Sequence, residues 1–288
     1  MKIYLNGKLV EREKAVVSVF DHGLLYGDGV FEGIRVYDKL VFRLKEHIDR
    51  LYRSALAIGL KIPMTKVGMT EAVIRTLKAN YLVDGYIRLV VTRGPGDLGL
   101  DPRKCGKPTV FIIADKIALY PNEFYRKGLA IVTARTRRNY PCSLDPRIKS
   151  LNYLNNILAK IDAIKSGTDE AIMLTYDDYV AECTGDNIFV VRSDELMTPP
   201  TSIGALEGIT REVVMALAED MDMTVCEKML KMDDVYGSDE VFLTGTAAEI
   251  IPVIKIDGRK IAGGKPGVKT LRLMEEFKKL TKTDGTKY

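Results

Sequence analysis

Residues in the second half of the chain could act together on an aldehyde cofactor that bears a phosphate. The amine of Lys149 could bond covalently to the aldehyde, and the Glu182 carboxylate could pair with a ring nitrogen. Two glycine-containing segments, Gly208-Ile209-Thr210-Arg211 and Gly245-Thr246-Ala247-Ala248-Glu249, could offer backbone N–H groups to the phosphate. Each feature is common by itself, and it is their order along one chain that favours this chemistry.

The sequence around Lys149 favours an unprotonated amine, which a nucleophilic lysine requires. Arg147 precedes it by two residues, and neighbouring positive charge destabilises an ammonium ion. Tyr153 follows at i+4, so the two side chains would share a face if this segment were helical. The alternative is that Lys149 is an ordinary solvated lysine, one of 43 basic residues.

The other candidate residues also have purely structural explanations. Glu182 could be a turn carboxylate, because Thr184-Gly185-Asp186-Asn187 follows it. Thr210 opens an amphipathic helix pattern and could simply cap that helix, although a helix N-terminus also binds phosphate. Gly245-Thr246 could be an ordinary turn after a strand.

Composition and charge restrict the class of protein. The 288 residues are 46% hydrophobic and 28% charged, with a net charge of +4, values typical of a globular protein with a large core. A dense basic patch occurs only at Arg135, Arg137, Arg138, Arg147 and Lys149, and we interpret it as a solvated face. It has no interleaved aromatic residues, so we expect no nucleic-acid binding.

Cysteine and histidine usage indicates neither a metal site nor a disulfide framework. The four cysteines lie far apart and there are only two histidines, so we expect no metal. Scattered cysteines without a signal peptide favour the cytoplasm. The longest apolar runs have the length of strands, so we expect no membrane span.

Strands and helices are mixed in the first part of the chain. Asn6-Gly7 between alternating apolar residues predicts a tight hairpin, and 29–37 alternates like a half-buried strand. Helices are predicted over 44–60 and 65–82, and further strands over 40–42, 86–92 and 109–114.

The pattern changes over 118–128, which we interpret as a connection between a domain at 1–117 and a domain at 129–288. The mixed order of elements indicates an α+β fold in two domains. A frayed tail is expected at 281–288. The second domain is predicted to contain strands at 129–134, 171–175, 187–191 and 240–244, helices at 152–164, 210–221 and 268–280, and a hairpin at 257–258.

The chain resembles the class IV aminotransferases, which are fold-type IV pyridoxal-phosphate enzymes, and among them the branched-chain amino acid aminotransferases. The resemblance runs from Asn6 to about Ile261. Besides the segments above, it is carried by Tyr26-Gly27-Asp28-Gly29-Val30-Phe31-Glu32-Gly33-Ile34-Arg35, Glu46-His47-Ile48-Asp49-Arg50-Leu51 and Gly245-Thr246-Ala247-Ala248-Glu249-Ile250. It implies the D-amino acid aminotransferase-like fold. In that fold a smaller N-terminal α/β domain supplies the substrate pocket, and a larger C-terminal pseudo-barrel domain binds pyridoxal 5′-phosphate.

The resemblance also implies roles toward the cofactor. Lys149 would bind it covalently and move a proton between the substrate Cα and the cofactor C4′. Glu182 would pair with the pyridinium nitrogen, and Tyr153 would donate to the phenolic oxygen. Arg50 would hold the phosphate, although at i+4 from Glu46 it could instead be a surface ion pair. The phosphate would also be bound by Ile209, Thr210 and Thr246.

The resemblance places the substrate against the first domain. Tyr26, Phe31 and Tyr86 would form an aromatic wall around an aliphatic side chain, or they could be ordinary core residues. Arg88 lies two residues after Tyr86, so on a strand both point to one face, where the guanidinium would bind the distal carboxylate of 2-oxoglutarate. Arg35 matches a second position near this wall.

Two further contacts follow from the resemblance. Leu100, in the loop 94–100 that reaches over a neighbouring subunit's pocket, would add apolar surface. Backbone N–H groups of Thr246 and Ala247 would receive the substrate α-carboxylate. The implied protein is a cytoplasmic homo-oligomer, at least a dimer, with a hexamer built as a trimer of dimers as the alternative. It would transfer amino groups between L-leucine, L-isoleucine or L-valine and 2-oxoglutarate.

Three alternatives share this fold: a D-amino acid aminotransferase, an aminodeoxychorismate lyase, and a binding protein without cofactor. The strand from Phe31 to Arg35, with Tyr86-x-Arg88, favours the L-branched-chain type. Retention of Lys149, Glu182, Tyr153 and Arg50 argues against a binding protein. The chain departs from some relatives in having no tryptophan on the interdomain loop, which carries Leu119-Tyr120, and in having Leu89 in place of proline.

Overall fold

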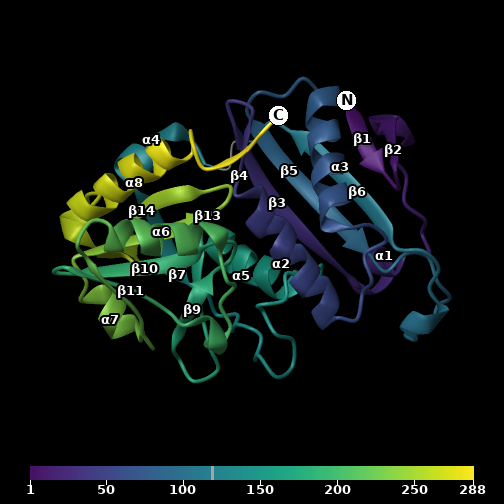
Figure 1. Cartoon of the computed structure of the whole chain (residues 1–288). Coiled ribbons are helices and arrows are strands. Elements are labelled where there is room, and N and C mark those ends of the chain that lie inside the picture. The colour runs from purple at the N-terminus through teal and green to yellow at the C-terminus, as the bar shows by residue number, and fades with distance from the viewer. Residues whose placement is uncertain (118–119) are drawn as a thin grey trace. The chain divides into compact units, whose positions relative to one another are not determined.

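The computed structural model describes residues 1–117 and 120–288, which form two compact units (Figure 1). Unit 1 contains Met1–Ile117, Ile148–Asn152 and Thr281–Tyr288, and unit 2 contains Ala118–Arg147 and Tyr153–Leu280. This division departs from the contiguous boundaries expected from the sequence, because two later segments pack with the first part of the chain. Residues 118–119 of the expected interdomain connection, including Leu119, lie outside the described residues.

Unit 1 is built on an antiparallel sheet with α2 (Leu44–Ala57) and α3 (Lys66–Ala79) on one face (Figure 1). In the described part of the chain its order is β16-β4-β3-β5-β6-β1-β2. The strands are β1 (Lys2–Leu5), β2 (Lys8–Glu11), β3 (Gly29–Tyr37), β4 (Leu40–Phe42), β5 (Gly85–Thr92), β6 (Thr109–Asp115) and β16 (Gly285–Lys287).

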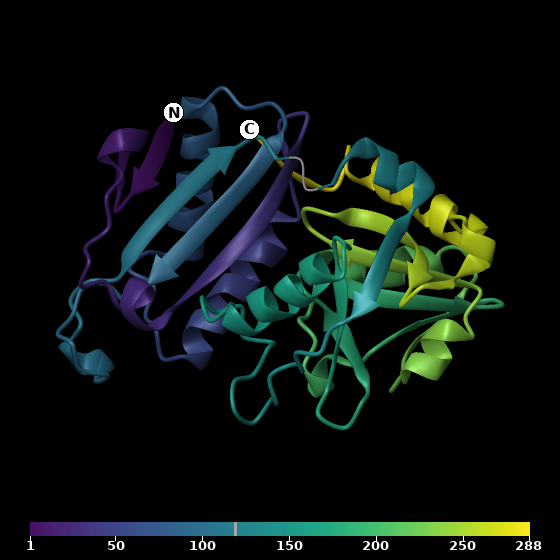
Figure 2. The ribbon, with the colours of Figure 1, turned by 180° about the vertical axis from the view of Figure 1, so that it is seen from behind.

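Strand alternation separates the two faces of this sheet. Ile34 and Leu89 point to the helical side, where they pack with Leu51 and other apolar residues of α2 and α3 in one core. Their sequence neighbours point to the opposite face of the sheet, and this face is turned toward the viewer in Figure 2. The predicted hairpin at Asn6-Gly7 is confirmed, with φ of 47° and 91° at the two turn residues.

The predicted frayed tail at 281–288 is wrong. β16 pairs with β4 in antiparallel register, and Asp284 forms an ion pair with Arg43. The Tyr288 hydroxyl donates to the Leu82 carbonyl oxygen. The tail is held by backbone pairing to the edge of β4. A segment this short shows no hydrophobic periodicity in the sequence, so its structure could not be predicted from the pattern.

Short helices complete unit 1. α1 (His22–Tyr26) begins after Asp21, whose carboxylate accepts a hydrogen bond from the backbone N–H of Gly23 at 2.8 Å. The 3₁₀ turns are η1 (Arg12–Lys14) and η2 (Pro102–Lys104).

Unit 2 is built on a curled sheet. Among the described residues its order is β12-β11-β10-β13-β14-β7-β8-β9, with β15 paired to β14. β9 and β10 are separated by four strands along this path, yet only residues 184–186 join them in sequence. The path must therefore bend round on itself, which gives the expected pseudo-barrel. The strands are β7 (Leu129–Thr133), β8 (Ala171–Leu174), β9 (Val180–Cys183), β10 (Asn187–Arg192), β11 (Glu195–Thr198), β12 (Thr224–Glu227), β13 (Glu240–Gly245), β14 (Glu249–Ile256) and β15 (Arg259–Lys260).

Helices surround the sheet of unit 2. α8 has the predicted bounds, whereas part of the predicted connection 118–128 forms α4 and packs against β14. No helix among the described residues is long and apolar enough to cross a membrane. The helices are α4 (Asn122–Lys127), α5 (Leu154–Lys165), α6 (Ile209–Glu219), α7 (Met232–Tyr236) and α8 (Val268–Leu280), with 3₁₀ turns η3 (Thr201–Ile203) and η4 (Ala262–Gly264).

Candidate functional site

Lys149 lies in an extended segment that pairs with the free edge of β3 in unit 1. Its carbonyl oxygen accepts from the Phe31 N–H at 3.0 Å, and the Leu151 N–H donates to the Gly29 carbonyl oxygen at 2.9 Å. Helix α5 begins only at Leu154, so the idea that Lys149 and Tyr153 share a helix face is wrong. Backbone pairing to a strand fixes the lysine more firmly than an exposed helix turn would.

Two further contacts hold Lys149 within unit 1. Its backbone N–H donates to the Oγ of Ser54, a buried residue of α2, at 3.1 Å. Its Nζ lies 4.7 Å from the centre of the Phe31 ring. The amine therefore points to the face of β3 that the helices leave uncovered.

Residues proposed for the substrate gather on this same face of β3 and β5. The Arg88 guanidinium carbon lies 4.6 Å from the centre of the Phe31 ring, and Arg88 Nη2 donates to the Tyr86 hydroxyl at 3.3 Å. The expected shared face of Tyr86 and Arg88 is thus observed. A Cβ at Gly33 would lie 1.8 Å from the Tyr86 hydroxyl oxygen, so only glycine leaves room for it.

Of the three other predicted substrate residues, one shares this face and two lie elsewhere in unit 1. Arg35 shares the face of Phe31, with its guanidinium carbon 5.0 Å from the centre of the Tyr37 ring. The Tyr26 hydroxyl donates to the Leu98 carbonyl oxygen at 2.5 Å, which ties α1 to the loop 94–101. Leu100, on that loop, is 78% exposed.

Arg50 is buried in an ion pair rather than lying on the helix surface. Its Nε and Nη2 both donate to the Glu32 carboxylate at 2.8 Å, and His47 Nδ1 lies 2.7 Å from Glu32 Oε2. The alternative partner Glu46 instead pairs with Arg43. Burial alone would raise the pKa of Glu32, but the Arg50 charge holds it well below its ordinary value. Burial also lowers the pKa of His47, which favours a neutral ring.

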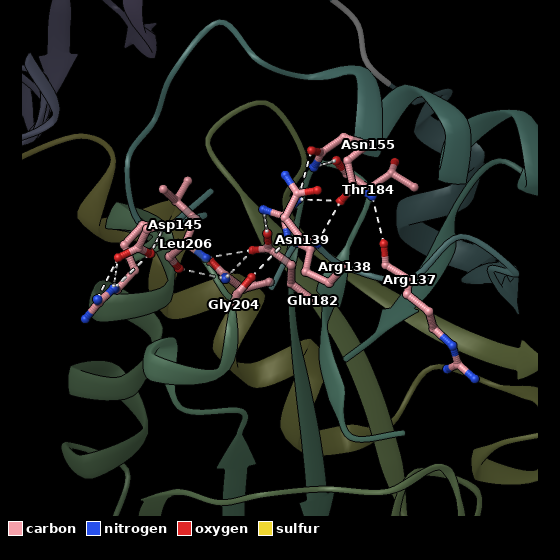
Figure 3. A network of polar contacts seen from close by, with 12 residues as sticks. Arg137, Arg138, Asn139, Asp145, Asn155, Glu182, Thr184, Gly204 and Leu206 are labelled. Carbon is pink, nitrogen blue, oxygen red and sulfur yellow. Dashed lines mark hydrogen bonds and ion pairs between the residues drawn. The ribbon is translucent and has the colours of Figure 1, made fainter. Parts of the chain in front are cut away.

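In unit 2, Glu182 lies on β9, and both of its carboxylate oxygens are engaged. Oε1 is 2.6 Å from Nη2 of Arg138. Oε2 accepts from the backbone N–H of Leu206 at 2.9 Å and from Asn187 Nδ2 at 3.3 Å. Figure 3 shows Arg138 reaching Glu182 and Gly204 together. The interpretation of Arg138 as part of a solvated basic patch is wrong, because it is buried.

The contacts of Asn187 connect Glu182 to the start of α6. Asn187 Nδ2 also donates to the Leu206 carbonyl oxygen at 3.0 Å, and a Cβ at Gly208 would lie 2.1 Å from Asn187 Oδ1. Gly208 is the N-cap of α6, and no side chain caps the helix. Thr210 is therefore not the cap, and the first N–H groups of α6 are suited to bind a phosphate.

The turn between β13 and β14 lies next to Asp186, which is in the connection between β9 and β10. A Cβ at Gly245 would lie 2.0 Å from Asp186 Oδ1, so the backbone approaches closely there. Thr246 and Ala247, in this turn, are half-buried. The buried Oγ1 of Thr244 has no hydrogen-bond partner among the described residues, although a buried hydroxyl is normally bonded. The uncapped helix, the glycine backbone and this hydroxyl fit a polar, phosphate-bearing cofactor.

Tyr153 is the N-cap residue of α5 and is half-buried. The next turn of the helix carries Asn155 and Asn156, whose Oδ1 atoms accept from Arg138 Nη1 at 3.3 and 2.9 Å. The α5 N-terminus is therefore linked to Glu182 through Arg138. Among the described residues, no group of three or more His, Cys, Asp or Glu side chains could hold a metal ion.

Sequence reasoning missed Glu32, Ser54 and Arg138. The alternation of β3 was one available signal. Glu32 lies two residues from each of the core residues Val30 and Ile34, so it shares their face of the strand and is buried. A buried carboxylate requires a cation nearby. Ser54 and Arg138 gave no comparable signal, since their partners are distant in sequence.

The chain is similar to known proteins over most of its length. The family model described as amino-transferase class IV matches residues 29–256. The chain is similar to a putative branched-chain-amino-acid aminotransferase of Methanocaldococcus jannaschii, with 55% identity covering 100% of this chain and 99% of the relative. It is also similar to a D-alanine aminotransferase of Staphylococcus epidermidis, with 36% identity covering 96% and 97%.

Solved structures agree as well. The crystal structure of a branched-chain aminotransferase from the thermophilic archaeon Thermoproteus uzoniensis with norvaline matches with a TM-score of 0.92 and 40% identity. The match covers 98% of this chain and 94% of that one. The α+β fold with two units is therefore confirmed.

Proposed function

The chain belongs to the class IV aminotransferase family, and we propose that it is a pyridoxal 5′-phosphate-dependent branched-chain amino acid aminotransferase. The reaction exchanges the amino group of L-leucine, L-isoleucine or L-valine with 2-oxoglutarate, giving the 2-oxo acid and L-glutamate. One observation carries the substrate class. It is the face of β3 and β5 on which Phe31 and Tyr86 lie beside Arg88 and the Lys149 amine.

The proposed cofactor contacts are assigned residue by residue. When bound, pyridoxal phosphate supplies an electron sink for negative charge at the substrate Cα. Lys149, whose amine lies 4.7 Å from the centre of the Phe31 ring, would bind it covalently and would hold and move the proton at the substrate Cα. Glu182 pairs with the ring nitrogen and Tyr153 donates to the phenolic oxygen. The phosphate is held by Arg50, Thr246 and the N–H groups of Ile209 and Thr210.

The substrate contacts follow from the open face of unit 1, which we propose forms the substrate pocket. Phe31, Tyr86 and Tyr26 contact the aliphatic side chain of a branched-chain donor. Arg88, with Arg35 near it on the same face, binds the distal carboxylate of glutamate or 2-oxoglutarate. The substrate α-carboxylate accepts from the N–H groups of Thr246 and Ala247.

A D-amino acid aminotransferase is the second candidate, supported by the similarity to the D-alanine aminotransferase. The decisive experiment compares donors in single half-reactions, with L-leucine, L-glutamate and D-alanine mixed separately with the cofactor-loaded enzyme. We expect rapid loss of the cofactor's visible absorbance with the two L-amino acids only. Faster reaction with D-alanine than with L-leucine would assign the protein to the second candidate.

We also propose a homo-oligomer, at least a dimer, with a trimer of dimers as the alternative assembly. Helix α5 presents an exposed apolar stripe in which Leu154 and Ile164 are 67% and 64% exposed. In unit 1, Leu98 and Leu100 on the loop 94–101 are 70% and 78% exposed. Apolar groups exposed in this way are typical of surfaces that a partner covers. A neighbouring subunit's pocket is the proposed destination of Leu100, and mass measurement by light scattering tests the assembly.

The four cysteines are all free, which agrees with a reducing compartment. We therefore propose a cytoplasmic location, to be tested by cell fractionation.

A further inference from the structure

Arg138 is a buried arginine whose guanidinium is bound on three sides by groups of unit 2. Nε donates to the Gly204 carbonyl oxygen at 2.9 Å. Nη1 donates to Asn156 Oδ1 at 2.9 Å, and Nη2 lies 2.6 Å from Glu182 Oε1 (Figure 3). These contacts fix the position and the plane of the guanidinium, so it acts as a rigid partner for one carboxylate oxygen.

The charges around Glu182 explain why a dedicated cation is needed. Glu170, Glu182 and Asp186 are all buried in unit 2. The nearby cations are Arg138 and Lys160, and Lys160 Nζ lies 3.3 Å from Glu170 Oε2. Within this described cluster, carboxyl groups therefore outnumber cations by one, and the excess must be relieved by a bound proton.

Asp186 is the carboxyl group that relieves this excess. Burial, together with the negative charge of Glu170, raises the pKa of Asp186 to about 7. The Glu170 carboxylate is satisfied separately, because its Oε1 accepts from the N–H groups of Ala171 and Thr184 at 2.9 and 2.8 Å. Tyr120 and Cys183 are also ionisable and lie beside Asp186 and Glu170, and burial raises the pKa of the Tyr120 hydroxyl and of the Cys183 thiol. Arg138 is therefore the counter-ion of Glu182, whereas Lys160 pairs with Glu170.

We propose that Arg138 is a positioning residue that supplies the counter-ion of Glu182 and orients its carboxylate toward the ring nitrogen of the cofactor. The inference rests on the proposed function, in which Glu182 is the partner of that nitrogen. Arg138 holds Oε1, while Leu206 N–H and Asn187 hold Oε2, so the plane of the carboxylate is set by protein groups alone. The guanidinium stays charged across the working pH range, so Glu182 keeps a counter-ion throughout.

Loss of Arg138 would leave Glu182 buried beside two other carboxyl groups. A buried carboxylate without a cation binds a proton, because the neutral form avoids the cost of desolvation. A protonated Glu182 no longer stabilises a positive ring nitrogen. We therefore expect Arg138→Met to act on the cofactor much as Glu182→Gln does, although Arg138 is assigned no contact with the cofactor.

The test measures the protonation state of the cofactor's ring nitrogen directly. Wild type, Arg138→Met, Arg138→Lys and Glu182→Gln are loaded with pyridoxal phosphate labelled with ¹⁵N at the ring, and the ¹⁵N chemical shift is followed between pH 6 and 9. We expect a protonated nitrogen in wild type, loss of that signal in Arg138→Met, and recovery of most of it in Arg138→Lys. Arg137→Met is the matched control, because Arg137 is exposed and pairs with exposed Asp178, and it should match wild type.

The possible outcomes separate the inference from the proposed function. An unchanged nitrogen signal in Glu182→Gln would overturn the ring-nitrogen role of Glu182, and with it this part of the proposed function. A changed signal in Glu182→Gln with a wild-type signal in Arg138→Met would overturn the role of Arg138 alone. If Arg138→Met does not fold, Arg138→Lys decides. A nitrogen that is as unprotonated in Arg138→Lys as in Glu182→Gln would then contradict the proposal, and a mostly protonated one would support it.

Discussion

The backbone N–H of Lys149 donates to the hydroxyl oxygen of Ser54 across 95 positions of sequence, at 3.1 Å. Ser54 is buried on α2, whose side chains also include Arg50. One helix of unit 1 therefore anchors the backbone of the proposed cofactor-binding lysine and carries the proposed phosphate-binding arginine. This relationship explains why Ile148–Asn152 belongs to unit 1 although its sequence neighbours belong to unit 2.

We expect Ser54→Ala to slow catalysis without releasing the cofactor. Loss of one hydrogen bond leaves the Lys149 N–H unpaired, which costs about 1–3 kcal/mol, and a misplaced amine reacts more slowly. The half-reaction rate with L-leucine should fall roughly tenfold, about 1.4 kcal/mol, while the absorbance of bound cofactor persists. Thr70→Ala removes a hydroxyl that bonds only within α3 and serves as the control. Equal rates in wild type and Ser54→Ala would show that backbone pairing to β3 alone positions the lysine.

Lys149→Ala should abolish steady-state transamination in a folded protein. The Lys149 amine lies on the open face of β3, 4.7 Å from the centre of the Phe31 ring, where it is proposed to bind the cofactor. Borohydride reduction of the wild-type holoenzyme followed by peptide mass spectrometry should place the pyridoxyl group on Lys149. Lys165→Ala, at the end of α5, is the control and should retain activity. A label on any other lysine would refute the assignment.

The ion pair between Glu32 and Arg50 predicts a pH-dependent stability. The folded state lowers the pKa of Glu32 below its ordinary value of 4.5. The stabilisation is therefore fully present above about pH 4.5, and it is lost progressively as the pH falls below that value. Glu32→Gln should destabilise the protein by about 3–5 kcal/mol near pH 7, since it leaves a buried guanidinium without its carboxylate.

Urea unfolding of wild type and Glu32→Gln at several pH values measures this effect. The difference between the two proteins should shrink as the pH falls below 4.5, because wild type loses its advantage there. Glu46→Gln removes the carboxylate that was the alternative partner of Arg50, and it should have little effect at any pH because its ion pair with Arg43 is partly open to solvent. A constant difference from pH 7 to pH 3 would mean that Glu32 acts through packing instead of charge.

Much of the fold follows from local patterns. The bounds of β3 and α8 were predicted from alternation and helical spacing, because each element buries one regular face. The four-residue strands β11 and β12 were not predicted, since a run of that length carries too little periodicity. The tail strand β16 has small and polar residues, and only its pairing with β4 gives it a structure.

Lys149 and Glu182 could be proposed from the sequence because a lysine amine and a carboxylate have the chemistry that the cofactor needs, and their roles stay predictions. Their supporting residues could not be proposed in this way, because support depends on contacts between distant segments. Arg138 looked like one basic residue among several, and only its place between Gly204 and Glu182 gives it a role. Sequence spacing also misled where a helix was assumed, because the segment of Lys149 is extended and pairs with β3.

The remaining prediction concerns how one pocket accepts two unlike side chains. A branched-chain donor presents hydrocarbon where glutamate presents a carboxylate. Phe31 and Tyr86 suit the first, and Arg88 suits the second, because its guanidinium lies over the Phe31 ring and bonds the Tyr86 hydroxyl. Arg88→Leu should therefore raise KM for 2-oxoglutarate and glutamate while changing KM for leucine much less.

The expected size of this selective effect is tenfold or more. Loss of a buried charge-assisted contact is worth roughly 2–5 kcal/mol, and each factor of ten corresponds to about 1.4 kcal/mol. Half-reactions followed through the cofactor absorbance measure leucine and glutamate separately, so a general loss of activity is recognised as such. Arg103→Leu, on an exposed turn where Arg103 pairs with Asp101, controls for the loss of a positive charge. Equal losses for leucine and glutamate in Arg88→Leu would show that Arg88 supports the fold of the sheet face, and carboxylate recognition would then fall to Arg35.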